Sequence, residues 1–365
     1  MVDQPLLSVR DLKTYFMADE GMVKAVDGVS FDVYPGQTLG IVGESGCGKS
    51  VTAHSILRVV EEPGRIVGGQ ILLRRNPAGR DTHRQNGSVE HKELDLVELS
   101  PNGRMMRSIR TGVIAYVFQE PMSAFSPVHS IGNQIREAIQ FHRNVSKREA
   151  HARGIELLRR VGIPRAEQRM DEYAFQLSGG LRQRALIAMA LSCDPELLIA
   201  DEPTTALDVT TQAQILELLA DLQEQNGMAI MLITHNLGVV AEMADDVVVM
   251  YLGRIVEEGP VDEIFYAPKH PYTQLLLKSI PSVYAESRTK LPTIAGSVPH
   301  PYSRPQGCPF HPRCPSFMRG TCDMHEPRLL AVDGLQKASC FLYEPLAVSS
   351  QLLDGSVGQT TDPNG

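Results

Sequence analysis

The sequence predicts an α/β fold that carries a small, loop-rich C-terminal extension. Residues 43–50 read GESGCGKS between an apolar run and a helix-forming stretch, an arrangement typical of a phosphate-binding loop. Residues 197–203 form a second apolar run, which ends in two adjacent carboxylates and a proline. Prolines and four cysteines crowd residues 281–340, where the periodic pattern is weak. These three observations indicate buried strands covered by helices, followed by a segment of different character.

The composition is that of a globular protein with a sizeable core. The chain has 365 residues, of which 42% are hydrophobic, so it can form one domain of ordinary size and a smaller one. Its 43 acidic and 35 basic residues give a net charge of -8, which argues against nucleic acid as the main partner. No apolar run is long enough to span a bilayer, and the first residues lack the pattern of a secretory signal. We therefore expect a cytosolic protein with largely reduced cysteines.

Apolar runs and alternating patterns predict the strands, and apolar residues at helical spacing predict the helices. In chain order, the predicted strands comprise residues 6–12, 23–33, 38–42, 68–73, 113–118, 197–203, 228–234, 247–251 and 253–258. The predicted helices comprise residues 51–60, 131–142, 147–161, 210–225 and 270–280. Residues 74–93 are polar and rich in turn formers, and we interpret them as an exposed inserted loop.

The phosphate-binding loop predicts how an anion is held. Gly43, Gly46 and Gly48 lack a Cβ, so the backbone can fold around a phosphate and point its N–H groups inward at a helix N-terminus. Lys49 is expected to reach the β- and γ-phosphates, and Ser50 to offer its hydroxyl to Mg²⁺. A lysine that follows a glycine-rich turn by chance would not explain the matching flanks.

The acidic strand end predicts the hydrolytic part of the site. Side chains alternate along a strand, so Asp201 and Glu202 cannot do the same work. We expect Asp201 to face Mg²⁺, directly or through water, and Glu202 to face the γ-phosphate and polarise the attacking water. Gln119 and His235 each end another predicted strand and are candidates for the same site. Two acids that merely cap the next helix are the alternative.

Two further features are ambiguous by themselves. Ser178, Gly179 and Gly180 stand at a predicted helix start, where the backbone N–H groups can approach an anion, although such a sequence is also a common turn. Tyr15 or Phe16 could stack on an adenine ring, and either could equally belong to the core.

Together these motifs resemble the ATP-binding subunit of an ABC transporter, specifically of the oligopeptide/dipeptide importer group, over roughly the first nine-tenths of the chain. Six short motifs occur in the family's order: the phosphate loop at residues 43–50, the Q-loop at Gln119, the signature at residues 177–180, the acidic strand end at Asp201 and Glu202, the D-loop at residues 206–208 and the switch histidine His235. Residues 118–122, 201–210 and 270–273 and the clustered cysteines suggest the subgroup. The loop at residues 74–93 is longer than is usual for this group of importers.

The resemblance implies a fold and a domain organisation. Residues 1–266 would form the ATPase domain, with a mixed sheet core, an antiparallel β subdomain and a helical subdomain at about residues 120–190. Residues 267–347 would form the C-terminal extension with its cysteine cluster, and residues 348–365 a disordered tail.

The resemblance also implies roles for individual residues. ATP would lie between the phosphate loop of one subunit and Ser178 of another, with Phe16 under the adenine. Catalysis would involve Glu202, His235 and Gln119, and Mg²⁺ would be bound by Ser50, Gln119 and Asp201. The residues assigned to the nucleotide are Phe16, Gly43, Glu44, Ser45, Gly46, Cys47, Gly48, Lys49, Ser50, Val51, Ser178, Gly179, Gly180 and Asp208.

The partners implied are a second ATPase subunit, identical or paralogous, and two membrane permeases that dock on the helical insert around residues 119–161. A solute-binding protein outside the cell would act indirectly, and the chain would lie at the cytoplasmic face of the inner membrane. Peptides are the expected cargo; nickel complexes, opines and oligosaccharides remain open. Two other classes of function are possible. One is a soluble ABC ATPase of DNA repair or translation, and the other is a binding module with an inert nucleotide site.

The cysteines of the extension predict a metal centre. Cys308, Cys314, Cys322 and Cys340 are spaced C-x5-C-x7-C-x17-C, which in a loop-rich cytosolic segment argues against disulfides. The spacing fits a [4Fe–4S] cluster better than a zinc knuckle. Zinc, with His311 and His325 as spare ligands, is the first alternative. The second is that the four cysteines are unrelated free thiols. We expect a structural staple, because the segment has few large apolar residues to bury.

Cys47 carries a separate prediction. It lies in the phosphate loop beside Lys49 and a helix N-terminus, both of which stabilise a thiolate. The sequence therefore predicts a lowered pKa and inhibition of the ATPase by thiol reagents.

Overall fold

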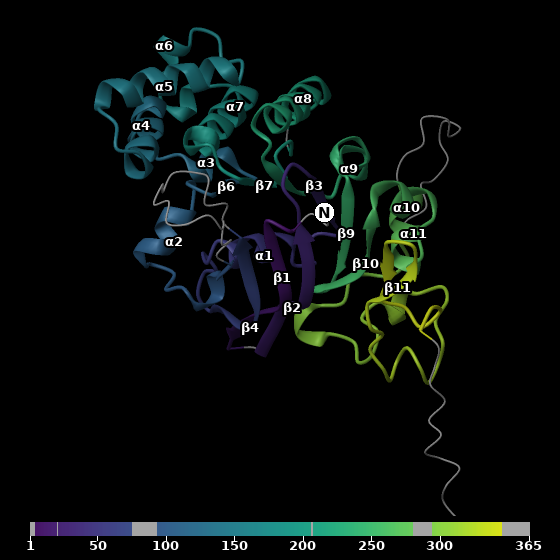
Figure 1. Ribbon diagram of the computed structural model, residues 1–365. Helices are drawn as coiled ribbons and strands as arrows, with labels where there is room; N and C mark the ends of the chain where they lie inside the picture. The colour runs from purple at the N-terminus through teal and green to yellow at the C-terminus, as the bar shows by residue number, and fades with distance from the viewer. Residues whose placement is uncertain (1–3, 20, 75–92, 206, 280–293, 345–365) are drawn as a thin grey trace, which may run out of the picture.

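The computed structural model of the protein describes residues 4–19, 21–74, 93–205, 207–279 and 294–344. Two sheets form its centre, and a group of helices gathers at one end of the molecule (Figure 1). The expected tail at residues 348–365, most of the expected loop at residues 74–93 and Ala206 of the D-loop lie outside the described residues.

The first sheet is antiparallel. Among the described residues it has four strands in the order β2–β1–β4–β5, with bounds β1 (Leu7–Ala18), β2 (Gly21–Val33), β4 (Gly64–Arg74) and β5 (Glu93–Asp95). Leu7 pairs with Val33 on one side and with Leu73 on the other. All three side chains are buried, because this register places the apolar members of each alternating strand on one face.

The second sheet is mixed. Among the described residues it has eight strands in the order β11–β12–β10–β9–β3–β8–β7–β6. Their bounds are β3 (Thr38–Val42), β6 (Ile114–Val117), β7 (Leu197–Asp201), β8 (Ala229–Ile233), β9 (Asp246–Tyr251), β10 (Arg254–Pro260), β11 (Leu330–Asp333) and β12 (Gln336–Ala338). The run from β9 to β6 is parallel, and the pairs that involve β10, β11 and β12 are antiparallel.

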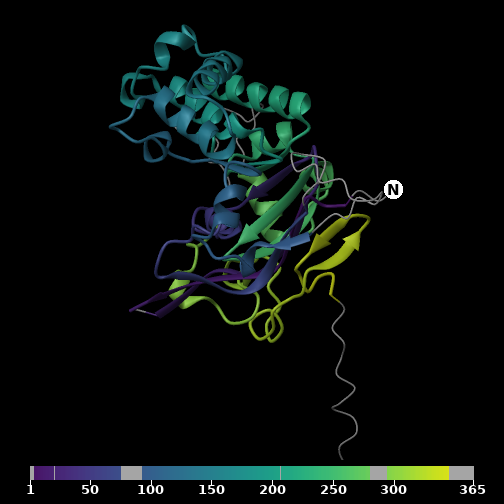
Figure 2. The same cartoon turned by 60° about the vertical axis from the view of Figure 1, so that its left-hand side comes forward.

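The helices divide into those that flank the sheets and those of an insert. The flanking helices are α1 (Lys49–Ile56), α2 (Arg104–Ile109), α8 (Val209–Asn226), α9 (Leu237–Met243), α10 (Val261–Tyr266) and α11 (Pro271–Lys278). The helical insert comprises α3 (Pro121–Ala124), α4 (Ile131–His142), α5 (Lys147–Arg160), α6 (Ala166–Arg169) and α7 (Gly179–Ala190), which stand together beyond the sheet in Figure 2. Within the described ranges, every helix is too short or too polar to cross a membrane.

Alternation along the central strands separates two cores. In β7, Leu197 and Ile199 pack with the antiparallel sheet and α1, whereas Leu198 and Ala200 pack with the helical insert. The strand is buried on both faces, which explains why it reads as a continuous apolar run.

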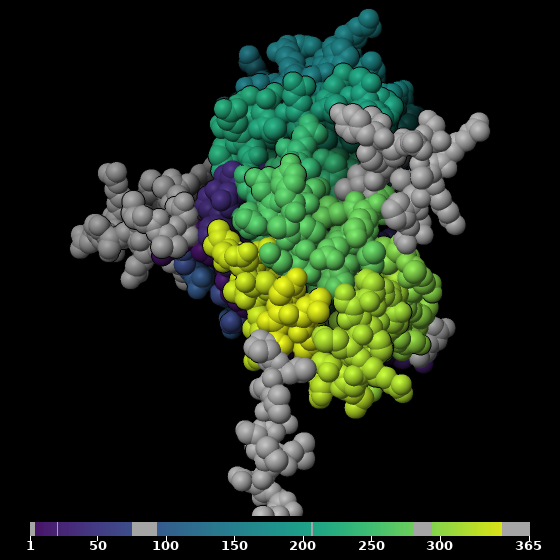
Figure 3. Space-filling model, turned by 90° about the vertical axis from the view of Figure 1, so that its right-hand side faces the viewer, coloured from purple at the N-terminus to yellow at the C-terminus, as the bar shows by residue number. Residues whose placement is uncertain are grey.

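The C-terminal extension shares a third core with the rest of the chain. Phe310 is fully buried and packs edge-on against Tyr251 of β9 and Tyr272 of α11. Cys308 and Cys322 belong to the same apolar cluster. The expectation that this segment buries little surface is therefore wrong for Phe310, which packs against β9 and α11, whereas Phe317, Met324 and Leu342 are exposed. Figure 3 shows the extension, lime to yellow, forming one continuous surface with the green residues that precede it.

Candidate functional site

The phosphate loop predicted at residues 43–50 joins β3 to α1, as the sequence indicates. Gly43 has φ +152°, and a Cβ there would lie 2.3 Å from the Met250 carbonyl oxygen. Gly48 has φ +106°, and a Cβ there would lie 2.3 Å from the Ala25 carbonyl oxygen. Only glycine fits either position, because both the backbone angle and the close approach of a second backbone exclude a side chain.

Lys49 is held inside this loop. Its Nζ donates to the carbonyl oxygens of Gly43 (2.8 Å) and Glu44 (3.2 Å), and the residue is only 6% exposed. The ammonium group thus lies among the loop carbonyls, where it is directed by the fold rather than free in solvent.

Cys47 differs from its prediction. Its side chain is buried, and although Lys49 lies close enough to stabilise a thiolate, burial outweighs that charge and raises the pKa of the thiol. The predicted lowering of the pKa is wrong, because the sequence shows the neighbouring charge but not the loss of solvent.

Asp201, the last residue of β7, is 2% exposed. One carboxylate oxygen, Oδ2, accepts a hydrogen bond from the Tyr116 hydroxyl at 2.8 Å. The other, Oδ1, is buried without a hydrogen-bond partner among the described residues. A buried carboxylate oxygen that lacks a donor is costly by itself and suits a divalent cation, so the donor set fits the Mg²⁺ expected here.

Glu202 follows directly after Asp201, and its carboxylate contacts three polar side chains. Its backbone has φ 47°, and its N–H donates to the Ile233 carbonyl of β8 at 2.8 Å. Oε2 accepts from Gln119 Nε2 (3.0 Å) and from the Thr205 hydroxyl (2.9 Å), and Oε1 lies 2.9 Å from Nδ1 of His235. The fold therefore brings Gln119, Glu202 and His235 together from three strand ends.

These contacts fix the charge of Glu202. Burial alone would raise its pKa, but the hydrogen bonds from His235 and Thr205 and the charge of Lys49 outweigh burial and lower the pKa. The group is ionised at neutral pH, as a carboxylate that orients water must be.

Ser178 and Asp208 lie at the starts of two helices. Ser178 occupies the N-cap position of α7, is exposed, and makes no side-chain capping bond among the described residues. Asp208 caps α8 by accepting from the Thr211 N–H (2.9 Å) and hydroxyl (2.7 Å). Gly179 and Gly180 begin α7 in the helical insert, on a different part of the molecule from the phosphate loop (Figure 1).

The aromatic residues of β1 differ in their surroundings. The Tyr15 hydroxyl donates to Asp27 at 2.6 Å, and burial together with this bond raises the pKa of Tyr15 to about 12. Phe16 is half-buried and lies against Gly64, where a Cβ would come 2.6 Å from its ring. The assignment of Phe16 to an adenine ring stays a prediction.

The four cysteines of the extension are free thiols, of which Cys308 and Cys322 are buried. Burial, and the neighbouring Cys322, Cys340 and Cys314, raise the pKa of Cys308 to about 12. Within the described residues, however, no group of three or more histidine, cysteine or acidic side chains is arranged to hold a metal ion. The predicted metal centre, whether iron–sulfur or zinc with His311 and His325, is not supported by the structure.

Sequence reasoning missed two residues of this site. Tyr116 and Thr205 contact the carboxylates of Asp201 and Glu202. A tyrosine within an apolar strand and a threonine two residues after a proline carry no motif, so no local signal distinguishes them. Glu44 is among the residues assigned to the nucleotide, but the sequence does not predict its contacts with the distant C-terminal extension.

The chain matches two families and many individual proteins. Residues 26–205 match the family described as ABC transporter, and residues 256–322 match the one described as oligopeptide/dipeptide transporter, C-terminal region. The oligopeptide transport ATP-binding protein AppD of Bacillus subtilis is 48% identical over 93% of this chain and 97% of its own length. The probable peptide ABC transporter ATP-binding protein y4tR of Sinorhizobium fredii is 48% identical over 92% of this chain and 94% of its own.

Solved structures agree on the fold. The dimeric ATP-binding cassette MJ0796 bound to ADP and Pi superposes with a TM-score of 0.58 at 23% identity, covering 70% of this chain and 98% of that one. CbiO1 of Clostridium perfringens, described as part of an ABC transporter complex, gives a TM-score of 0.56 at 26% identity, covering 73% of this chain and 92% of that one.

Proposed function

This chain belongs to the ABC transporter family as an ATP-binding subunit of the oligopeptide type, and we propose that it hydrolyses ATP to power the import of peptides through a membrane complex. The observation that carries this proposal is the convergence of Gln119, Asp201, Glu202 and His235 at the strand ends beside the phosphate loop. A binding module with an inert site would not need an ionised carboxylate held by three donors.

ATP would be held by the loop and by charge. The loop N–H groups and Lys49 would bind the phosphates, and Ser50, Gln119 and Asp201 would hold Mg²⁺, which would supply positive charge for phosphoryl transfer. The buried Oδ1 of Asp201, which has no hydrogen-bond partner in the part of the chain that the structure describes, supports this assignment. Tyr116 fixes the orientation of the Asp201 carboxylate through its hydrogen bond to Oδ2.

Glu202 would orient and polarise the attacking water. Gln119 and Thr205 bind one oxygen and His235 the other, so the carboxylate cannot rotate freely. Phosphoryl transfer depends on positioning and charge more than on covalent chemistry, and a fixed anion supplies both.

The site would be completed by a second ATPase subunit, identical or paralogous. Ser178, Gly179 and Gly180 expose a hydroxyl and backbone N–H groups at the N-terminus of α7, which suits a γ-phosphate bound in another subunit. Asp208 and the exposed Val209 at the start of α8 would lie at the same interface. ATP would hold this dimer closed, and hydrolysis would release it.

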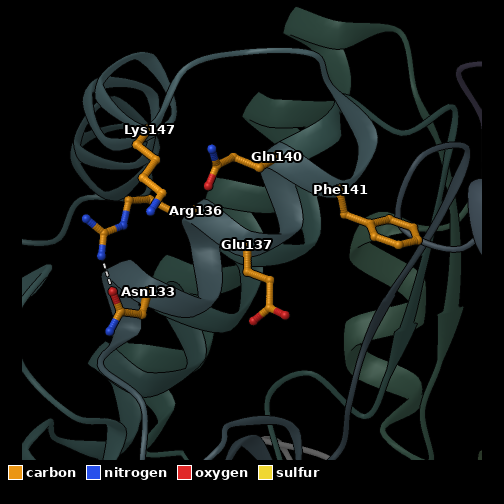
Figure 4. A pocket seen from close by; sticks show the side chains of 6 residues that line it. All are labelled: Asn133, Arg136, Glu137, Gln140, Phe141 and Lys147. Carbon is orange, nitrogen blue, oxygen red and sulfur yellow. Dashed lines mark hydrogen bonds between the residues drawn. The ribbon is translucent and has the colours of Figure 1, made fainter.

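The helical insert would carry the docking surface for two permeases. On α4 and the start of α5 a hollow of about 560 Å³ is lined by Asn133, Arg136, Glu137, Gln140, Phe141 and Lys147. Phe141 is 61% exposed at one end of it, with charged and amide side chains around the rest (Figure 4). An apolar anchor in a polar rim suits a helix presented by a membrane protein. Docking there would place the chain at the cytoplasmic face of the inner membrane.

We also propose that the chain has two functional parts, the ATPase domain at residues 1–266 and the C-terminal extension at residues 267–347.

A [4Fe–4S] cluster at Cys308, Cys314, Cys322 and Cys340 remains a proposal. The argument for it is the gathering of four free cysteines in this segment, two of which are buried in the apolar cluster. Protein purified without oxygen should be brown and contain iron; colourless protein without iron would exclude the cluster.

The whole complex tests the peptide proposal. ATPase activity of the reconstituted subunits and permeases should rise when the solute-binding protein carries a peptide. The same assay with nickel complexes, opines and oligosaccharides gives the comparison. Stimulation by one of these and not by peptides would replace the proposed cargo.

A further inference from the structure

Two residues of the C-terminal extension, Arg313 and Tyr272, contact Glu44 of the phosphate loop. Arg313 binds the Glu44 carboxylate with both guanidinium nitrogens, at 2.7 Å to Oε2 and 3.1 Å to Oε1. The Tyr272 hydroxyl accepts a hydrogen bond from the Glu44 main-chain N–H at 2.9 Å. Both the side chain and the backbone of this loop residue are therefore fixed by residues more than two hundred positions away.

This ion pair is not an ordinary surface contact. The Arg313 side chain is only 4% exposed, and that of Glu44 26%. Arg313 also donates to the Tyr251 hydroxyl (3.3 Å) and to the Ala295 carbonyl (3.2 Å), so its fork is held from several sides. A bidentate, shielded pair of this kind is stronger and more directional than exposed pairs, which contribute little.

Glu44 transmits the contact to the phosphate-binding lysine. Its carbonyl oxygen accepts from Lys49 Nζ (3.2 Å) and from the Cys47 N–H (3.2 Å). The extension thus holds Glu44, and Glu44 holds the backbone turn that directs Lys49. A loop already fixed in its binding shape loses less conformational freedom when a phosphate arrives.

A second contact fixes the extension near the other end of the site. Arg304 binds Asp27 of β2 at 2.8 Å, and the Tyr15 hydroxyl donates to the same carboxylate at 2.6 Å. Tyr15 directly precedes Phe16, which is the residue assigned to the adenine. The extension is therefore joined to β2 directly, and through Asp27 to Tyr15 of β1, the strand that carries Phe16.

We propose that Arg313 and Tyr272 are positioning residues that pre-form the phosphate loop through Glu44, so that the C-terminal extension sets the nucleotide affinity of this ATPase. The proposal rests on the assignment of the loop as the nucleotide site. The extension is then part of the catalytic unit, and any change that shifts Arg313 changes ATP binding.

Calorimetric titration of the purified full-length chain with MgADP tests it. Arg313→Gln should weaken binding about tenfold, because the bidentate pair is lost, and Arg313→Lys should restore part of the loss. Tyr272→Phe, which keeps the ring packing and removes the acceptor, should weaken binding by a smaller factor. Arg328→Gln is the matched control: Arg328 is an exposed arginine of the extension that pairs with Glu344 away from the loop, and its loss should leave affinity unchanged.

A double-mutant cycle separates positioning from general stability. If Arg313 acts through Glu44, the pair Glu44→Gln and Arg313→Gln should bind MgADP no more weakly than either single variant. In steady-state assays the KM for ATP should rise more than kcat falls. Additive losses, or a lowered melting temperature with unchanged affinity, would overturn the proposal.

Lys49→Ala distinguishes this failure from failure of the site itself. If Lys49→Ala weakens binding and Arg313→Gln does not, only the role of the extension is wrong. If Lys49→Ala leaves MgADP affinity unchanged, the loop is not the nucleotide site and the function proposed for it fails as well.

Discussion

Nδ1 of His235 lies 2.9 Å from Oε1 of Glu202, although 33 residues separate them in the chain. The two residues follow neighbouring parallel strands, β8 and β7, so the sheet itself sets their distance. The histidine side chain is 60% exposed and the carboxylate 14%. An exposed ring thus fixes a sheltered anion from the side open to solvent.

Glu202→Gln should abolish turnover and keep ATP binding. The amide has the shape of the carboxylate but not the charge that polarises water, so we expect kcat to fall at least about 100-fold. Size-exclusion chromatography with MgATP should show a trapped dimer. Glu217→Gln, an exposed position on α8, is the control. Hydrolysis at the normal rate would contradict the role of Glu202.

Lys49→Ala should weaken nucleotide binding itself. The variant removes the buried ammonium group that we assign to the phosphates, and we expect a loss of roughly 30-fold or more in MgATP affinity. Equilibrium binding of a fluorescent ATP analogue measures it. An unchanged dissociation constant would remove Lys49 from the site.

His235→Ala should change the pH dependence of turnover. His235 is one of the groups that lower the pKa of Glu202, so its removal raises that pKa. The carboxylate is then protonated at higher pH, and activity should be lost earlier as the pH falls. The acid limb of the kcat profile, with exposed His129→Ala as control, shows this shift. Coinciding acid limbs would mean that His235 does not act through Glu202.

Cys47 should react slowly with iodoacetamide. Burial raises its pKa, so little thiolate is present at neutral pH, and the sulfur is covered. Mass spectrometry of the native and unfolded protein should show a rate far higher after unfolding. Rapid native modification that MgATP prevents would restore the sequence-based prediction.

The buried His270 should make stability depend on pH. Its Nδ1 accepts the Tyr272 N–H at 3.0 Å, and burial lowers its pKa to about 3. Below the unfolded pKa of about 6.5 the unfolded chain binds a proton that the folded chain excludes, so unfolding becomes easier as the pH falls from about 6.5 toward 3, by up to about 1.4 kcal/mol per pH unit. His270→Asn, which can still cap α11, should flatten this slope in denaturant titrations. Equal slopes would show that His270 does not titrate on unfolding.

Local patterns predicted the central elements well. The strand expected at residues 38–42 and the helix expected at 131–142 have the bounds of β3 and α4. The helix expected at residues 51–60 ends at Ile56, because Arg58 adopts the left-handed conformation and Pro63 follows. An arginine carries no signal for that conformation, so the sequence alone could not place this boundary.

Elements and contacts that depend on residues far apart in the chain could not be predicted from the sequence. The short strand β12 was missed because it is stabilised by β10, where Glu257 pairs with Ala338. The family motifs indicated Gln119, Asp201, Glu202 and His235 as site residues. They did not indicate which of these side chains contact one another. The Tyr116–Asp201 and Arg313–Glu44 contacts depend on strand order and on docking of the extension, which no local pattern contains.

The hairpin of β11 and β12 has a consequence for solubility. β12 covers the backbone of β10, which would otherwise be the last strand of the second sheet on that side. A sheet edge with unpaired N–H and C=O groups is a template for joining another chain. A truncated chain that ends before β11 would expose β10 in this way, and we expect it to aggregate even where its nucleotide site is intact.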